Sequence, residues 1–376
     1  MTSAALIVMA GPNVKLTSAL NAAPRLRAGP AIIAAARSGL VEPVKALGQP
    51  GAPELPRPVP PPILSSLSFS EEDTMDRLTL AVVSRNYFNM PAWVARHAGL
   101  FAAEGLEVSI DHIEGIEEVD ARVRDGRAQL AYGVTEHVVL DAESGGGQIV
   151  IGGNVNKLPF SFVARPEVRR LEDLRGRRIG VSSLRAGSSS LVMKLLAARG
   201  LHYPEDYELV PCGPILARWD LLRSGGIDAG LQGAPLDYIA LDQGFNSLGN
   251  PRDEVPDFQF TSLDVDTAWA AANRDKLLRF LRAFLRAHAL FYANREGANA
   301  IAVRESGIEE RYADRAWRDY TAAEIFPRDG RASIPGIQAL IETSALIREL
   351  PSRARTRAAE YVDHSWIDAA EASLQP

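Results

Sequence analysis

A run of small and hydroxylated residues, Ser182 to Ser190, has the residue types that most clearly favour ligand binding in this sequence. It follows an apolar stretch that ends at Val181 and leads into a segment with helical periodicity. Small residues let the backbone approach a ligand, hydroxyls add hydrogen-bond donors, and the start of a helix attracts anions. The run lacks the G-x-x-x-x-G-K-S/T pattern of nucleotide-binding loops. A helix cap within a polar turn is the alternative interpretation. We predict ligand contacts from Ser183, Arg185, Gly187, Ser188 and Ser189.

A second candidate segment, Arg85 to Phe88, follows the first apolar strand of the sequence. The carboxyl ends of parallel strands are where small ligands bind in open α/β sheets. Asn86 is a candidate hydrogen-bonding group, and Tyr87 and Phe88 are candidates for stacking on an apolar ligand. A polar surface loop with one aromatic ring tucked into the core is the alternative.

Five further residues occupy comparable positions at the ends of predicted strands or the starts of helices. Thr135 begins a helix, where it can cap the helix and also bind a ligand. Asn154 lies near a predicted crossing of the chain, and Gln232 and Gly233 close a strand. Arg218 lies on the helix after another strand, and a surface ion pair is the favoured interpretation for it.

The charges in these loops favour an anionic ligand. Arg85, Arg185, Arg218 and Lys157 all lie in or near them. The planar fork of arginine matches carboxylate or sulfonate oxygens. We therefore expect the ligand to be a small organic anion.

The composition argues against several other kinds of site. Cys212 is the single cysteine, so the chain forms no internal disulfide and no cysteine-based zinc site. The six histidines show no H-x-x-x-H or H-E-x-x-H spacing. A net charge of −6 argues against nucleic-acid binding, and no apolar run reaches the roughly 18 residues that span a bilayer. We predict no catalytic residue, metal, cofactor, nucleic-acid partner or membrane span.

The elements that position these residues alternate between strand and helix in two blocks. Such alternation predicts an α/β fold with parallel-rich sheets. From about residue 265 the pattern is helical to the end, and Leu277, Leu281 and Phe284 share one helix face. The predicted strands are 78–83, 106–110, 128–132 and 149–151 in the first block and 161–164, 178–181, 208–210 and 227–231 in the second.

Residues 1–74 differ from the rest, because they contain 11 of the 24 prolines and no acidic residue before Glu42. Proline-rich runs favour extended polyproline and exclude helix. No basic residue precedes the apolar stretch near the start, as a secretory signal would require. We predict a disordered leader, or a misassigned start with Met75 as the true one.

Three stretches of the sequence together carry a resemblance to a known family. They are residues 91–108, P-A-W-V-A-R-H-A-G-L-F-A-A-E-G-L-E-V, residues 171–181, L-E-D-L-R-G-R-R-I-G-V, and residues 225–235, G-G-I-D-A-G-L-Q-G-A-P. The sequence thereby resembles the family of ABC-transporter substrate-binding proteins that includes the sulfonate, taurine and nitrate binders and the NMT1/THI5-like group. The first stretch is similar to the family's opening helix and second strand, the second to the start of its second lobe, and the third to its G-x-I-D-A strand.

The resemblance implies a type II periplasmic-binding-protein fold, in which two α/β lobes joined by two crossing strands close on a small molecule. Lobe 1 would comprise residues 75–163 and 252–376, and lobe 2 residues 164–251. The implied function is the solute-binding component of an ABC importer, with a permease and an ATPase on other chains. The implied location is the periplasm, or the cytoplasm if Met75 is the true start.

Two other functions stay open. The first is an enzyme on the same fold, similar to the thiamin-pyrimidine synthases or to aromatic acid decarboxylases. The synthases use an active-site histidine and a cysteine-rich motif, whereas the loop after the first strand here has no histidine and the chain has one cysteine. The second is a cytoplasmic ligand sensor.

Overall fold

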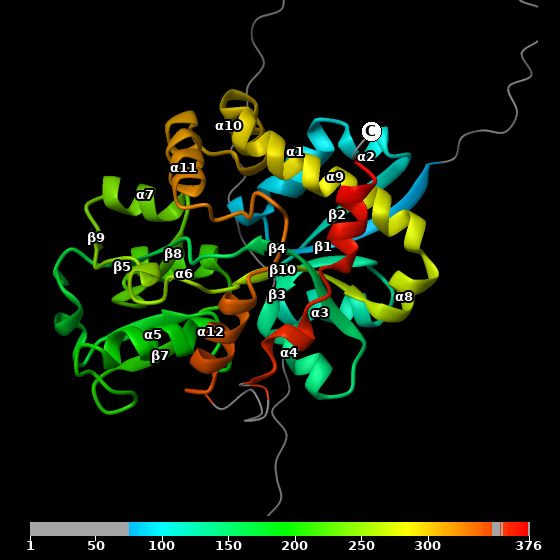
Figure 1. The fold of residues 1–376 in the computed structure, drawn as a ribbon. Helices are drawn as coiled ribbons and strands as arrows, with labels where there is room; N and C mark the ends of the chain where they lie inside the picture. The colour runs from blue at the N-terminus through cyan, green and yellow to red at the C-terminus, as the bar shows by residue number, and fades with distance from the viewer. Residues whose placement is uncertain (1–74, 348–353, 355, 375–376) are drawn as a thin grey trace, which may run out of the picture. The chain divides into compact units, whose positions relative to one another are not determined.

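A computed structural model describes residues 75–347, 354 and 356–374. The predicted leader, residues 1–74, lies outside the described residues. The described chain contains two five-stranded sheets, each with helices packed on it (Figure 1).

The first sheet has the strand order β2-β1-β3-β10-β4. β1 pairs in parallel with β2 and β3, and β10 is antiparallel to β3 and β4. Apolar side chains such as Leu78, Leu80 and Val82 are buried, as expected for a sheet covered by helices. The strands are β1 (Asp76–Val83), β2 (Leu106–Ile113), β3 (Leu130–Val134), β4 (Gln148–Val155) and β10 (Thr261–Asp266).

The second sheet has the order β7-β6-β8-β5-β9. β6 pairs in parallel with β7 and β8, and β5 is antiparallel to β8 and β9. The strands are β5 (Phe160–Ala164), β6 (Arg178–Val181), β7 (Glu208–Pro211), β8 (Ala229–Gly233) and β9 (Asn246–Ser247).

The helices of the described residues follow the predicted alternation. Those of the first block and the C-terminal part are η1 (Tyr87–Asn89), α1 (Met90–His97), α2 (Leu100–Ala103), α3 (Ile116–Arg124), α4 (Thr135–Glu143), α8 (Thr267–Ala272), α9 (Arg274–Ala293), α10 (Arg295–Ser306), α11 (Glu310–Ala322), α12 (Ile334–Ser344), η5 (Ala358–Tyr361) and α13 (Ser365–Ala372). Those of the second block are η2 (Leu171–Leu174), α5 (Gly187–Ala197), α6 (Ile215–Ser224), α7 (Leu236–Asp242) and η3 (Pro251–Asp253).

The antiparallel strand in each sheet results from the two crossings between the sheets. β4 of the first sheet leads through residues 156–159 into β5 of the second, and β9 leads back through residues 248–260 into β10. The parallel strands of both sheets end at the side that faces the other sheet. A strand that has just crossed therefore enters at that side and runs the opposite way. The sheets are mixed but mainly parallel, as the resemblance implies.

The division into lobes at residues 163 and 251 stays a prediction. Phe160 already pairs with Gly233 in the second sheet, so we propose that the first boundary lies a few residues earlier. α12 contacts both α5 and α4 and therefore touches helices of both sheets (Figure 1).

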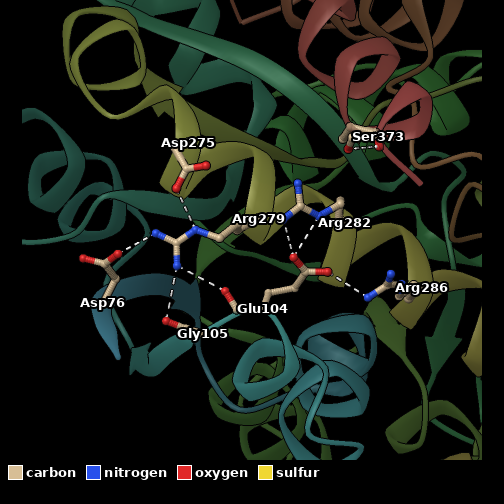
Figure 2. Close-up of polar contacts among 9 residues, drawn as sticks. Asp76, Glu104, Gly105, Asp275, Arg279, Arg282, Arg286 and Ser373 are labelled. Atoms are coloured by element: carbon tan, nitrogen blue, oxygen red, sulfur yellow. Dashed lines mark hydrogen bonds and ion pairs between the residues drawn. The ribbon is translucent and has the colours of Figure 1, made fainter. Parts of the chain in front are cut away.

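The amphipathic helix α9 packs against α1 and α2, near the start of the described residues, and against the C-terminal helix α13. One face buries Leu277, Leu281 and Phe284, as predicted. The other face carries arginines spaced three or four residues apart, which reach α2 and β1 (Figure 2). Arg282 donates to Glu104 Oε2 at 2.8 Å from Nε and 2.5 Å from Nη2, and Arg286 donates to Glu104 Oε1 at 2.7 Å. Glu104 is thus a buried carboxylate held by two guanidinium groups.

Candidate ligand-binding site

Two adjoining hollows lie between the sheets, at the carboxyl ends of their parallel strands. The inner hollow has a volume of about 50 Å³ and the outer one about 310 Å³. Both contact the end of β3 at Val134 and the turn after β6. This is the position at which open α/β sheets bind small molecules. The residues that line both are Ile116, Val134, Ser182, Ser188 and Phe260.

Three phenylalanine rings form most of one wall of the inner hollow. Phe88 follows β1, Phe160 begins β5, and Phe260 precedes β10. Their ring centroids are 5.0 to 5.8 Å apart, and the rings meet edge to face. Aromatic pairs prefer this geometry. Since the rings come from the first sheet's loop and from both crossings, they form an apolar surface where the sheets meet.

Arg218 contributes the positive charge at the inner hollow, and it is 2% exposed. Nη1 donates to the carbonyl of Leu231 at 2.9 Å, and Nη2 donates to Ser182 Oγ at 3.2 Å. Its Nε is buried without a partner, and no carboxylate among the described residues forms an ion pair with it. Burial lowers its pKa to about 10, so the group stays charged at neutral pH.

Two glycines make room for the Arg218 side chain. Gly180 of β6 and Gly230 of β8 are paired neighbours in the second sheet. A Cβ at Gly180 would lie 3.0 Å from Arg218 Cγ, and one at Gly230 would lie 2.9 Å from Arg218 Cδ. The side chain of Arg218 therefore lies across a bare patch of sheet, and its guanidinium reaches the strand ends.

The serine turn between β6 and α5 lines the outer hollow. Ser188 Oγ accepts a hydrogen bond from the backbone N–H of Ser182 at 2.9 Å, and Ser183 Oγ accepts one from Arg185 N–H at 3.1 Å. Ser189 Oγ donates to the carbonyl of Ser183 at 2.6 Å. These bonds preorganise the turn without any ligand. Residues of this turn therefore both stabilise the turn and line the cavity.

His137 and Asp120 were not among the residues selected from the sequence. His137, on the first turn of α4, lines the outer hollow and also a further hollow of about 350 Å³ beside α3. Its Nδ1 is hydrogen-bonded to Asp120 Oδ2. The sequence feature that could have identified His137 is its position two residues after Thr135, at the end of the same strand.

The Asp120–His137 pair retains its shared proton more tightly than an isolated histidine would. Burial raises the pKa of Asp120. Burial alone would lower the pKa of His137, but the hydrogen bond to Asp120 and the negative charges of Asp120 and nearby glutamates together raise that pKa. Behind the pair, burial raises the pKa of Asp264, whose Oδ1 accepts from Ser262 Oγ at 2.5 Å. His137 therefore brings a group capable of proton transfer to the wall of the outer hollow, with Asp120 behind it.

The structure brings half of the predicted site residues to these hollows. Contrary to the surface interpretation of Arg218, its side chain is fully buried, because the glycine patch admits it. The predicted residues that line a hollow are Asn86, Phe88, Ser183, Arg185, Gly187, Ser188 and Arg218.

Arg85, Tyr87 and Thr135 are placed elsewhere. Arg85 pairs with Glu305 at 2.5 Å, away from the hollows. Tyr87 is 1% exposed and packs with its ring centroid 4.7 Å from that of Tyr320. Thr135 does not cap α4, because its hydroxyl donates to Ser262 Oγ at 2.9 Å.

The remaining four predicted residues lie behind the lining. Asn154 Nδ2 donates to Thr261 Oγ1 at 3.1 Å, so it supports a residue that lines the inner hollow. Ser189 is tied to the turn, as described above. Gln232 is fully buried, and Gly233 lies against the Phe88 and Phe160 rings.

Within the part of the chain that the structure describes, no group of three His, Cys, Asp or Glu side chains is arranged to hold a metal ion. Over those same residues, the helices are each too short or too polar to cross a bilayer.

Comparisons with solved structures identify the fold. The alkanesulfonate-binding protein SsuA from Xanthomonas axonopodis pv. citri, bound to MOPS, superposes with a TM-score of 0.63 at 18% identity, over 76% of this chain and 98% of that one. The periplasmic nitrate-binding protein NrtA from Synechocystis superposes with a TM-score of 0.65 at 11% identity, over 80% and 89%. The chain therefore has the periplasmic-binding-protein fold.

Sequence comparisons identify the family. A curated relative, the 4-amino-5-hydroxymethyl-2-methylpyrimidine phosphate synthase of Schizosaccharomyces pombe, is 25% identical over 173 residues, which are 45% of this chain and 48% of that protein. The chain thus aligns with about half the length of this relative. The model of the NMT1/THI5-like family matches residues 87–298, which is more than half of the sequence. The chain belongs to the NMT1/THI5-like family.

Proposed function

We propose that this protein binds a small organic anion between its two sheets. Arg218 is the observation that carries the proposal: a fully buried guanidinium without a carboxylate partner among the described residues, at the inner end of a hollow. A buried charge is costly unless it is paired. An anionic group of a ligand would supply the missing charge, and the phenylalanine rings would contact its apolar part.

We further propose that the protein is the solute-binding component of an ABC importer and works in the periplasm. Its partners would be a permease and an ATPase on other chains. The fold shared with alkanesulfonate- and nitrate-binding proteins supports this proposal. The serine turn and the loop after β1 lie on opposite sides of the hollows, so closure of the sheets on a ligand would bury it.

The test is calorimetric titration with MOPS, nitrate and benzoate as three anions of different shape. We expect one class to bind to the unaltered protein, and Arg218→Met to weaken that binding at least about a hundredfold. Arg218→Lys keeps the charge and should lose less. Arg223→Met is the matched control, because Arg223 lies on the same helix but pairs with Asp220 at the surface. Equal binding to Arg218→Met and to the unaltered protein would refute the assignment.

An enzyme that uses His137 and Asp120 is the second candidate. The observation that favours it is that His137, at the wall of the outer hollow, is hydrogen-bonded to Asp120, and a synthase is among the relatives. A histidine backed by a carboxylate is a common proton acceptor in catalysis. Mass spectrometry of a bound anion after incubation tests this. Catalysis would be supported if the unaltered protein forms a product and His137→Asn forms none while it still binds the anion. Recovery of the anion unchanged from the unaltered protein would support binding alone.

A further inference from the structure

A separate polar hollow of about 210 Å³ lies between α7 and α11, on the other side of Phe160 from the candidate ligand-binding site. α7 packs on the second sheet, whereas α11 packs on α10. A water molecule occupies about 30 Å³ in the liquid, so the hollow has room for a molecule of several heavy atoms. Phe160 contributes to both hollows and separates them.

Two guanidinium groups, those of Arg252 and Arg315, line this hollow, and Arg315 lies near enough to Asp237 to act against the rise in that carboxyl's pKa. Arg315 lies over the ring of Tyr238, with its Cζ 4.2 Å from the ring centroid. Arg252 comes from η3, on the crossing between the sheets. Neither arginine forms an ion pair within the described residues, whereas most arginines on nearby surfaces do. Two guanidinium groups in the wall of one hollow can hold a carboxylate.

Two carboxyl groups line the same hollow. Asp237 is 6% exposed, and it accepts from the N–H of Tyr238 at 2.9 Å and from Ser161 Oγ at 3.4 Å. Asp319 accepts from the hydroxyl of Tyr238 at 2.7 Å. Burial raises the pKa of Asp237 to about 7, so its charged form is disfavoured until a cation lies beside it. Positive and negative groups therefore face one small space.

A buried hydroxyl without a hydrogen-bond partner lies in the wall of this hollow, where a bound molecule could accept from it or donate to it. Tyr320 lines the hollow and is 2% exposed. Its hydroxyl has no hydrogen-bond partner among the described residues. Buried polar groups are almost always hydrogen-bonded, so such a group in the wall of a polar hollow is a candidate ligand contact.

We propose that this hollow is a second binding site, for a small zwitterion of the α-amino acid class. Arg252 and Arg315 hold the carboxylate, Asp237 and Asp319 hold the ammonium group, and the Tyr320 hydroxyl bonds to either. A zwitterion matches the site better than an anion does, because an anion would leave the two carboxyl groups facing like charge. The proposal is independent of the ligand held at Arg218.

The experiment is a calorimetric titration of the full chain with each standard L-amino acid. For the amino acid that binds best, two further compounds are titrated. The matching des-amino acid keeps only the carboxylate, and the matching amine keeps only the ammonium group. We expect at least one amino acid to bind with a Kd below about 1 mM, which is a modest affinity. Both single-ended compounds should bind at least about tenfold more weakly, since each loses a charge-assisted contact.

Variants separate this site from the other one. Arg252→Gln and Asp237→Asn should each weaken amino acid binding about tenfold or more. Arg328→Gln is the control for loss of an arginine, because Arg328 lies over a tyrosine ring at 3.9 Å, as Arg315 does, but pairs with Glu324 at the surface. Unfolding temperatures check that each variant folds.

Three results would overturn the proposal. The first is that no amino acid binds. The second is a des-amino acid that binds as well as its parent, which would make the hollow a simple anion site. The third is loss of amino acid binding in Arg218→Met, which would place the molecule between the sheets. Retained binding in Arg218→Met together with loss in Arg252→Gln would support the second site.

Discussion

Replacing Arg218 by methionine should make the ligand-free protein more stable while it weakens ligand binding at least about a hundredfold. Methionine matches the aliphatic stem of arginine and is flexible enough to lie across Gly180 and Gly230, where the arginine methylenes lie now. The substitution removes the charge without leaving a large cavity. It therefore tests whether the guanidinium serves the fold or the ligand.

The effect on stability is a balance of two contributions. The variant loses two hydrogen bonds, to Leu231 and Ser182, each with a net value of about 1 kcal/mol. It also removes a buried charge without an ion-pair partner, for which the desolvation penalty is several kcal/mol. We expect the free energy of unfolding to rise by about 1–3 kcal/mol.

The effect on binding has the opposite sign. A ligand anion that pairs with Arg218 would lose its counter-charge and remain buried in an apolar hollow. Breaking a buried pair costs about 3–5 kcal/mol, which corresponds to a loss of affinity of roughly a hundredfold to several thousandfold. A residue whose replacement raises stability but lowers ligand affinity typically serves binding rather than folding.

Urea unfolding without ligand and calorimetric titration with the anion found for the unaltered protein are the two assays. Both use the same preparations, with Arg223→Met as the control. A variant that is destabilised by more than about 1 kcal/mol and binds the anion normally would show that Arg218 is a structural residue. That result would refute the reasoning from its unpaired charge.

Three further predictions concern other parts of the structure. Gly180→Ala should lower both anion affinity and stability, the latter by about 1–3 kcal/mol, because the new Cβ would lie 2.4 Å from Ile227 Cδ1. Asp120→Asn should lower the pKa of His137, measured by NMR titration, since burial alone lowers that pKa. In the unaltered protein the stabilisation from the raised pKa of His137 is present below about pH 6.5 and is lost as the pH rises through that pKa. Glu104→Gln should cost about 1–3 kcal/mol in urea unfolding, because two arginines donate to this carboxylate.

Matched controls and contrary results complete these tests. Gly115→Ala is the control for Gly180→Ala, because its Cβ would meet only Glu118 Cβ, at an ordinary 3.5 Å. Normal binding by Gly180→Ala would contradict the role of the glycine patch. A His137 pKa that is unchanged in Asp120→Asn would contradict the pairing. Glu107→Gln is the control for Glu104→Gln, since Glu107 forms an exposed pair with Arg77. Equal costs for the two would show that burial of Glu104 contributes nothing.

Local pattern predicted the strands β1 to β8 in their order, but it missed β9 and β10 among the described residues. The strand at Arg178–Val181 was predicted with the bounds that the structure has, and the helix predicted to carry Leu277, Leu281 and Phe284 on one face became α9, Arg274–Ala293. Apolar runs, glycine boundaries and helical spacing are properties of neighbours in the chain. The sequence also selected the serine turn and Phe88, which line the candidate hollows. It could do so because the loop that follows a strand lies at the edge of the sheet where ligands bind.

The tertiary structure alone decided the burial of Arg218 and the pairing of His137. Gly180 and Gly230 are 50 residues apart and become neighbours only when β6 and β8 pair. Asp120 meets His137 only because α3 and α4 pack side by side. Sequence periodicity indicates which face of an element is apolar, but not which distant side chain fills the space opposite a glycine. Whether a charge is exposed or buried depends on those distant neighbours, and so the chemistry of this site became visible only in the folded chain.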